Sequence, residues 1–152
     1  MSFEVAQVPR KRLAGIAHQG PYQRIGESFM RLAPKAEALG LTRTTDAAFV
    51  AVYFDDPEVT DENALRSLAA ITVADDAVIG DLIDGQIPPG KYVISRVYGP
   101  YSELPDAWRR LNRELVEAGQ ERRGGVTFEV YFHPGDDPPP EQIRTDVYLP
   151  IA

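Results

Sequence analysis

The feature that most constrains this fold is an internal repeat. Short motifs of the first half recur in the second half at one constant offset: Gly20-Pro21-Tyr22 recurs as Gly99-Pro100-Tyr101, and Phe29 recurs as Trp108. Nearer the end of each half the offset is shorter by one, since Tyr53-Phe54 recurs as Tyr131-Phe132. Self-similarity at a fixed spacing is typical of a chain that contains two copies of one structural unit. The sequence therefore predicts a duplicated unit.

The two repeats are expected at about 3–74 and about 80–152. Each shows two short strand patterns, then a helical pattern whose apolar residues alternate steps of four and three, then two more strand patterns. One unit alone would leave a face of its sheet and helix uncovered. We therefore expect a single domain, 1–152, of the α+β class, in which duplicated strand-helix-strand-strand units pack around a pseudo-two-fold axis.

Prolines and glycines mark the expected ends of the helices. Pro105 suits a first helical turn, and Gly40 and Gly119 suit the positions just past the two C-termini. Pro34 falls inside the first helical pattern, where proline removes one backbone hydrogen bond. The sequence predicts a bend or an early end of the first helix at that point.

The composition excludes several classes of function. Without cysteine the chain has no disulfide, no thiolate nucleophile and no cysteine-ligated metal centre. A formal charge of −7, from 23 acidic and 16 basic residues, opposes direct binding to nucleic acid and mildly favours cationic ligands. No apolar run approaches the roughly 20 residues that span a bilayer, and no secretion signal is evident. We expect a cytoplasmic protein without membrane contact.

The stretch 126–133, Val-Thr-Phe-Glu-Val-Tyr-Phe-His, has the alternation of a strand with one packed face. Alternation places Glu129 and Tyr131 on the same face. A charged residue at an exposed strand centre is ordinary, so this stretch taken alone favours a solvated glutamate. In the first half Ala51 takes the place of Glu129, and Tyr53 takes that of Tyr131. One acid faced by a small residue is what a single asymmetric pocket would contain.

Four motifs together resemble a known family. They are the turns at 18–22 and 98–101, the strand at 128–131 and the closing strand at 145–151. Their order and spacing are similar to those of the GyrI-like small-molecule-binding family, which includes effector-binding domains of AraC-type and MerR-type multidrug regulators. The resemblance covers about residues 3–151. It implies an antiparallel sheet with helices on one side and a ligand cleft between the halves.

The resemblance also implies a ligand class. In multidrug-binding members a buried glutamate among aromatic residues meets lipophilic cations, and the matching position here is Glu129. Since little sequence lies outside the fold, we expect a stand-alone member without a helix-turn-helix, which senses or sequesters a drug or toxin. Its partner would be a lipophilic or cationic small molecule, with no direct binding to nucleic acid.

A lipophilic cation needs apolar contact area and one negative charge, and each aromatic ring adds a cation–π attraction of about 0.5–2 kcal/mol. Trp108 lies in the apolar stripe of the second helix, where core packing is the simpler interpretation, although it could reach the cleft. Tyr22 and Tyr101 follow Gly-Pro and suit a structural role at least as well as ligand contact. The candidates for ligand binding are Glu129, Tyr131, Tyr148, Trp108, Tyr53, Phe49 and Ala51.

Two other functions stay open. Some stand-alone members of the family are hydrolases that open the cyclopropane of DNA-alkylating toxins, so a cofactor-free hydrolase would use Glu129 as general acid or base with Tyr148 assisting. Other members are linked to gyrase inhibition, so the second alternative is a protein-binding module with a protein partner. We expect no cofactor and no metal, because the only histidines, His18 and His133, lie in separate halves. No serine nucleophile motif is recognisable.

Overall fold

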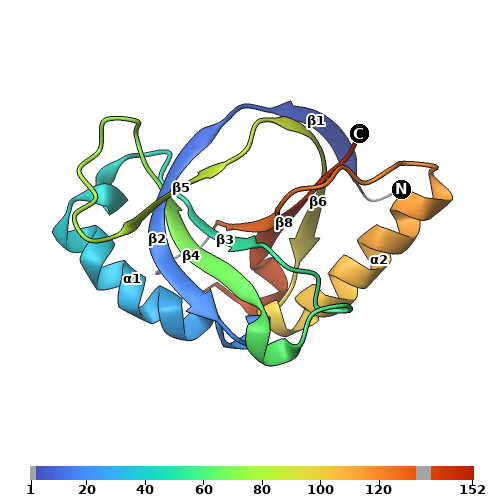
Figure 1. Cartoon of the computed structure of the whole chain (residues 1–152), viewed down its shortest axis with the longest axis horizontal. Helices are drawn as coiled ribbons and strands as arrows, with labels where there is room; N and C mark the ends of the chain where they lie inside the picture. The colour runs from blue at the N-terminus through green and yellow to red at the C-terminus, as the bar shows by residue number, and fades with distance from the viewer. Residues whose placement is uncertain (1–2, 133–137) are drawn as a thin grey trace.

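The computed structural model describes residues 3–132 and 138–152, so His133 lies outside the described residues. The described part forms an eight-stranded antiparallel sheet with two α-helices. The sheet curls into a half-barrel, and both helices lie outside the curl (Figure 1). The predicted α+β class is confirmed.

The elements of the second half follow those of the first at the offsets found in the sequence, and in the same order. The first half contains β1 (Glu4–Val8), β2 (Lys11–Gln19), α1 (Gly26–Ala38), β3 (Phe49–Tyr53) and β4 (Arg66–Thr72). The second half contains β5 (Ile83–Ile87), β6 (Gly90–Tyr98), α2 (Leu104–Glu117), β7 (Thr127–Tyr131) and β8 (Arg144–Pro150).

The order of strands in the sheet is β1-β6-β8-β7-β3-β4-β2-β5. The β3–β7 pair lies at the centre of the sheet. On either side of this pair the strands follow in equivalent order: β4, β2 and β5 beside β3, and their counterparts β8, β6 and β1 beside β7. The first strand of each half pairs with the second strand of the other half, β1 with β6 and β5 with β2. The halves therefore share one continuous sheet, while their common origin stays a prediction.

Both helices cover the same face of the sheet, as predicted. In each strand, every second residue faces the helices, because successive side chains of a strand point to opposite sides of the sheet. For α1 the buried contacts join Leu32 and Ala36 to Ala14 and Ile71. For α2 they join Leu111 and Leu115 to Val93, Val97, Val147 and Leu149. We call this helix-covered face the outer face.

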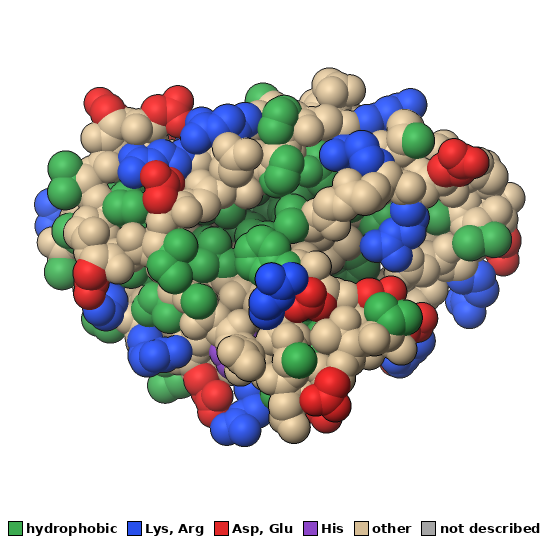
Figure 2. Space-filling view, in the orientation of Figure 1, with side chains coloured by type: hydrophobic (Ala, Val, Ile, Leu, Met, Phe, Trp, Pro, Cys, Tyr) green, Lys and Arg blue, Asp and Glu red, His purple; other side chains and the backbone are tan. Residues whose placement is uncertain are grey.

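The inner face of the half-barrel has its own apolar cluster. Figure 2 shows a hollow lined by hydrophobic side chains in the middle of the view, inside the curve of the sheet. Buried residues of this cluster are Leu13, Val50, Val52, Leu68, Ala70, Ile87, Tyr92 and Phe128. Two residues that are adjacent in a strand therefore pack in different apolar clusters, one on the inner face and one on the outer face.

The helix ends agree with most of the sequence signals. Gly40 and Gly119 adopt left-handed φ angles of 75° and 71° just past α1 and α2, and Pro105 lies in the first turn of α2. Of the two outcomes expected at Pro34, a bend or an early end, the early end does not occur, because α1 continues through this residue to Ala38. Within the described residues, neither helix is long and apolar enough to cross a membrane.

Candidate functional site

Glu129 lies in the middle of β7, in the central strand pair, directly opposite Ala51 of β3. Its side chain is on the outer face, and only 3% of the residue is exposed. The interpretation of Glu129 as a solvated strand residue, which the stretch alone favours, is therefore wrong. Burying a carboxylate is costly unless hydrogen bonds or opposite charges compensate it, so its partners decide what the position can do.

Three side chains donate hydrogen bonds to the Glu129 carboxylate. The hydroxyls of Tyr53 and Tyr131 both donate to Oε1, at 2.6 and 2.7 Å, and the indole Nε1 of Trp108 donates to Oε2 at 2.6 Å. An ionised carboxylate only accepts, so it suits three donors. We call these four residues the Glu129 cluster. It brings together β3, β7 and α2, and it includes Trp108 despite the simpler core interpretation.

No lysine or arginine of the described residues forms an ion pair with Glu129. Among those same residues, no group of three His, Asp or Glu side chains could hold a metal ion. The carboxylate therefore has hydrogen-bond donors but no positive charge beside it. A buried carboxylate without a paired cation makes this position a candidate for binding one.

The two tyrosines of the cluster keep their protons far into the alkaline range. Burial raises the pKa of Tyr53 well above its ordinary value of 10, and the charge of Glu129 acts in the same direction. The same two causes raise the pKa of Tyr131 well above 10. Both hydroxyls therefore remain hydrogen-bond donors to Glu129 at neutral pH.

Further aromatic rings surround the cluster in a symmetric arrangement. The ring of Tyr22 lies 4.5 Å from that of Tyr53, and its counterpart Tyr101 lies 5.5 Å from Tyr131. Phe29 meets Tyr131 edge-on at 5.6 Å. The sequence analysis did not select Phe29, although its position matches that of Trp108 in the repeat. That match is the signal that could have identified it.

Tyr22 also has a structural role. Its hydroxyl accepts from the Asp55 N–H, and its single proton lies within bonding reach of the backbone oxygens of Asp55 and Arg66, at 2.8 and 3.1 Å. It thereby ties the turn before α1 to the ends of β3 and β4. Burial raises the pKa of Tyr22 from 10 and that of the half-exposed Tyr101 as well.

The structure does not bring Tyr148 to Glu129, which corrects the prediction that the two share a ligand site or a catalytic pair. In the β7–β8 register Tyr148 lies opposite Phe128, and Val147 lies opposite Glu129. Tyr148 stacks on Phe128 with ring centroids 4.4 Å apart. Its side chain is therefore on the inner face of the sheet, because residues directly opposite each other share a face.

The two remaining candidates are on the same face as Glu129. Ala51 is fully buried opposite Glu129, where it packs with Ile25 and Ala69. Phe49 lies opposite Tyr131 in the β3–β7 register, and its ring is 6.1 Å from that of Phe29. All the candidates selected from the sequence except Tyr148 therefore lie on the outer face around the central strand pair.

Comparison with known proteins identifies the family of the chain. The family model of the GyrI-like small molecule binding domain matches residues 1–152. The chain belongs to the GyrI-like family. A curated relative, DNA gyrase inhibitor 2 of Dickeya dadantii (strain 3937), is 27% identical over 140 residues, which cover 89% of this chain and 86% of the relative.

Solved structures share the GyrI-like fold. The C-terminal domain of EcmrR has a TM-score of 0.77 at 18% identity, with 99% of this chain and 96% of that domain covered. SAV2435 bound to tetraphenylphosphonium has a TM-score of 0.73 at 15% identity, with 100% of this chain and 94% of the SAV2435 chain covered. At such identities these neighbours show the fold alone, and the residues of this chain must carry the argument about its ligand.

Proposed function

We propose that this GyrI-like domain binds a lipophilic organic cation and that Glu129 is the anionic anchor for its positive charge. The observation that carries the proposal is a carboxylate that is 3% exposed and hydrogen-bonded to Tyr53, Tyr131 and Trp108. Hydrogen bonds satisfy its oxygens but leave its charge without a counter-ion. A cation beside the Glu129 cluster would supply that missing charge.

The aromatic surroundings support the lipophilic part of the proposal. Rings of Tyr22, Phe29 and Tyr101 extend the cluster across the outer face. Aromatic rings give a large apolar contact area and attract cations to their faces. The structural neighbour SAV2435 is bound to tetraphenylphosphonium, a lipophilic cation. A ligand of this class is the natural first probe for the present chain.

A ligand can reach Glu129 only if a covering side chain moves, since so little of the carboxylate is exposed. The outermost ring beside the cluster is that of Tyr101, which is 47% exposed and lies over Tyr131. The proposal therefore includes a rearrangement of aromatic side chains on binding.

A thermal-shift screen tests the proposal. Wild type, Glu129→Gln and the exposed control Glu117→Gln are screened against lipophilic cations, neutral dyes and electrophilic compounds, with chemical analysis of each ligand afterwards. Cations should stabilise wild type and Glu117→Gln but not Glu129→Gln, and they should be recovered intact. Equal stabilisation of all three proteins would contradict the anchor. Consumption of a ligand would instead identify the hydrolase.

A protein-binding module is the second candidate, because curated relatives are named DNA gyrase inhibitors. In this case the domain should bind purified DNA gyrase without any small ligand, and Glu129→Gln should bind it as well as wild type. Size-exclusion chromatography of the mixed proteins would reveal such a complex. Separate elution of the two proteins would remove this candidate.

A further inference from the structure

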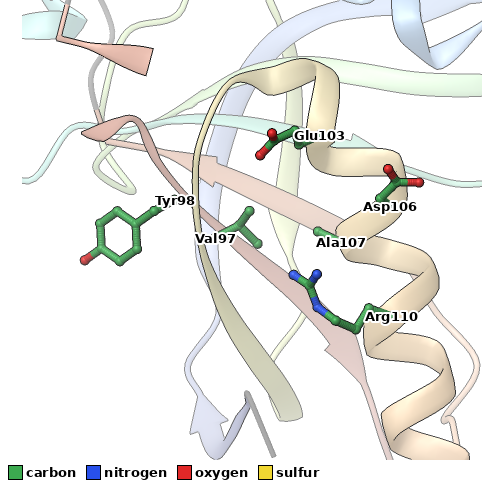
Figure 3. A pocket seen from close by; sticks show the side chains of 6 residues that line it. All are labelled: Val97, Tyr98, Glu103, Asp106, Ala107 and Arg110. Carbon is green, nitrogen blue, oxygen red and sulfur yellow. The ribbon is translucent and has the colours of Figure 1, made fainter. Parts of the chain in front are cut away.

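A pocket lies between the end of β6 and the first turns of α2 (Figure 3). Its volume is about 310 Å³. Val97 and Ala107 form its apolar part, and Arg110 contributes a positive charge. Its other lining residues are Tyr98, Glu103 and Asp106. None of the residues that bond Glu129 lines this pocket.

The repeat places a filled counterpart of this pocket in the first half. At the offset that relates Gly20 to Gly99, Val97 corresponds to His18, Ala107 to Ser28 and Arg110 to Arg31. His18 Nδ1 lies 3.0 Å from Ser28 Oγ, and its Nε2 lies 3.2 Å from the carbonyl oxygen of Pro21. An imidazole ring and a hydroxyl thus stand at the two first-half positions that match Val97 and Ala107 of the pocket.

The partners of His18 define the bonding pattern of its ring. The Pro21 carbonyl can only accept, so Nε2 carries a proton and donates to it. Nδ1 shares a hydrogen bond with the Ser28 hydroxyl, whose oxygen also accepts from Arg31 Nη2 at 3.2 Å. Ser28 is fully buried, and these bonds satisfy its hydroxyl.

The second half has Val97 and Ala107 in place of the ring and the hydroxyl, and its pocket has a carboxylate, Glu103, and a guanidinium, Arg110, at opposite ends. The carbonyl of Pro100 accepts the Glu103 backbone N–H at 3.0 Å, as that of Pro21 accepts the Arg24 N–H at 3.0 Å. Arg110 has no hydrogen bond or ion pair with another described residue, and its guanidinium points into the pocket (Figure 3).

We propose that this pocket binds a neutral azole ring of the imidazole type. The ring N–H would donate to the Glu103 carboxylate at one end of the pocket, and the other ring nitrogen would accept directly from Arg110 at the other end (Figure 3). Direct contact with Arg110 is possible because Ala107 lacks the hydroxyl that Ser28 places between Arg31 and His18. This ligand differs in charge and in place from the cation proposed at Glu129.

The test uses imidazole as the probe, at a pH where the free molecule is neutral. Backbone amide NMR of wild type should show saturable shifts at Val97, Glu103, Ala107 and Arg110. The analogue 1-methylimidazole has no N–H donor, so it should bind at least about tenfold more weakly. Arg110→Ala should weaken imidazole binding as well. Shifts that do not saturate, or equal binding of both compounds, would overturn the proposal.

A second pair of variants tests the internal comparison. Val97→His combined with Ala107→Ser recreates the ring and hydroxyl of the first half, and it should abolish imidazole binding while the fold is kept. Undiminished binding to that variant would refute the assignment. The reverse change, His18→Val with Ser28→Ala, should open a second imidazole site beside Pro21. If the His18→Val, Ser28→Ala variant folds but binds no imidazole beside Pro21, the comparison between the two halves is refuted. If that variant does not fold, the Val97→His, Ala107→Ser variant and Arg110→Ala decide the question.

Discussion

Glu129 and Ala51 lie directly opposite each other in the β3–β7 pair at the centre of the sheet. Because the strand order is symmetric about this pair, each residue occupies the position that the other has in its own half. A carboxylate therefore faces a methyl group. Tyr53 and Tyr131, which are counterparts in the repeat, both bond the same carboxylate oxygen. A nearly symmetric frame thus holds one negative charge.

The donors of the Glu129 cluster should differ in their contribution to stability. Glu129 Oε1 has two donors, but Oε2 has only Trp108 among the described residues. Trp108→Phe should therefore lower the free energy of unfolding by about 1–3 kcal/mol, because a buried acceptor loses its partner. Tyr53→Phe and Tyr131→Phe should each cost less. Urea unfolding at neutral pH measures all three.

Packing and hydrogen bonding at Trp108 can be separated with a double-mutant cycle. In a Glu129→Leu background the indole has no carboxylate to bond, so Trp108→Phe should cost less than it does in wild type. The same cost in both backgrounds would mean that Trp108 contributes through packing alone.

Stability should fall at high pH through Tyr53 and Tyr131. Their pKa values are raised in the folded state above the ordinary value of 10, so above pH 10 the unfolded chain releases protons that the folded chain retains. Their contribution is complete below pH 10 and is lost as the pH rises towards the folded-state pKa values. Urea unfolding over this range should show a steeper decline for wild type than for Tyr53→Phe with Tyr131→Phe. Parallel curves would contradict the assigned shifts.

Close packing of β2 against β4 makes Gly15 sensitive to substitution. An added Cβ would clash with the backbone carbonyl of Ala69, so Gly15→Ala should destabilise the fold by about 1–3 kcal/mol. Gly26 of α1 has nothing within 4 Å of its added Cβ, so Gly26→Ala is the matched control. It should be neutral or slightly stabilising, because alanine favours helix. Thermal unfolding compares them, and similar losses in both would contradict the packing argument.

The repeat explains why so much of the fold could be predicted from the sequence. The offsets between matching motifs also relate the described strands of the two halves, and they place Ala51 opposite Glu129. The burial of Glu129 could not be read from β7 alone, because alternation separates two faces without showing which one helices cover. Trp108 of α2, distant in sequence, is part of that cover.

Register between strands limited the prediction for Tyr148. A shift of one residue moves every side chain of a strand to the other face, and sequence alone does not fix the register of β8 against β7. The pairing of Tyr148 with Phe128 places its ring on the inner face. Packing limited the prediction of an open pocket at Ala51. This residue is small, but it is fully buried, so its size alone leaves no open space opposite Glu129.

Calorimetric titration with tetraphenylphosphonium tests the central claim most directly. The cation is compared with the neutral triphenylphosphine oxide on wild type, Glu129→Gln and the control Glu117→Gln. We predict that Glu129→Gln lowers the affinity for the cation at least about tenfold, which corresponds to about 1.4 kcal/mol. The affinity for the neutral compound should stay unchanged, and Glu117→Gln should bind both compounds as wild type does. Equal weakening of both compounds, or unchanged affinity for the cation, would show that Glu129 is not its anchor.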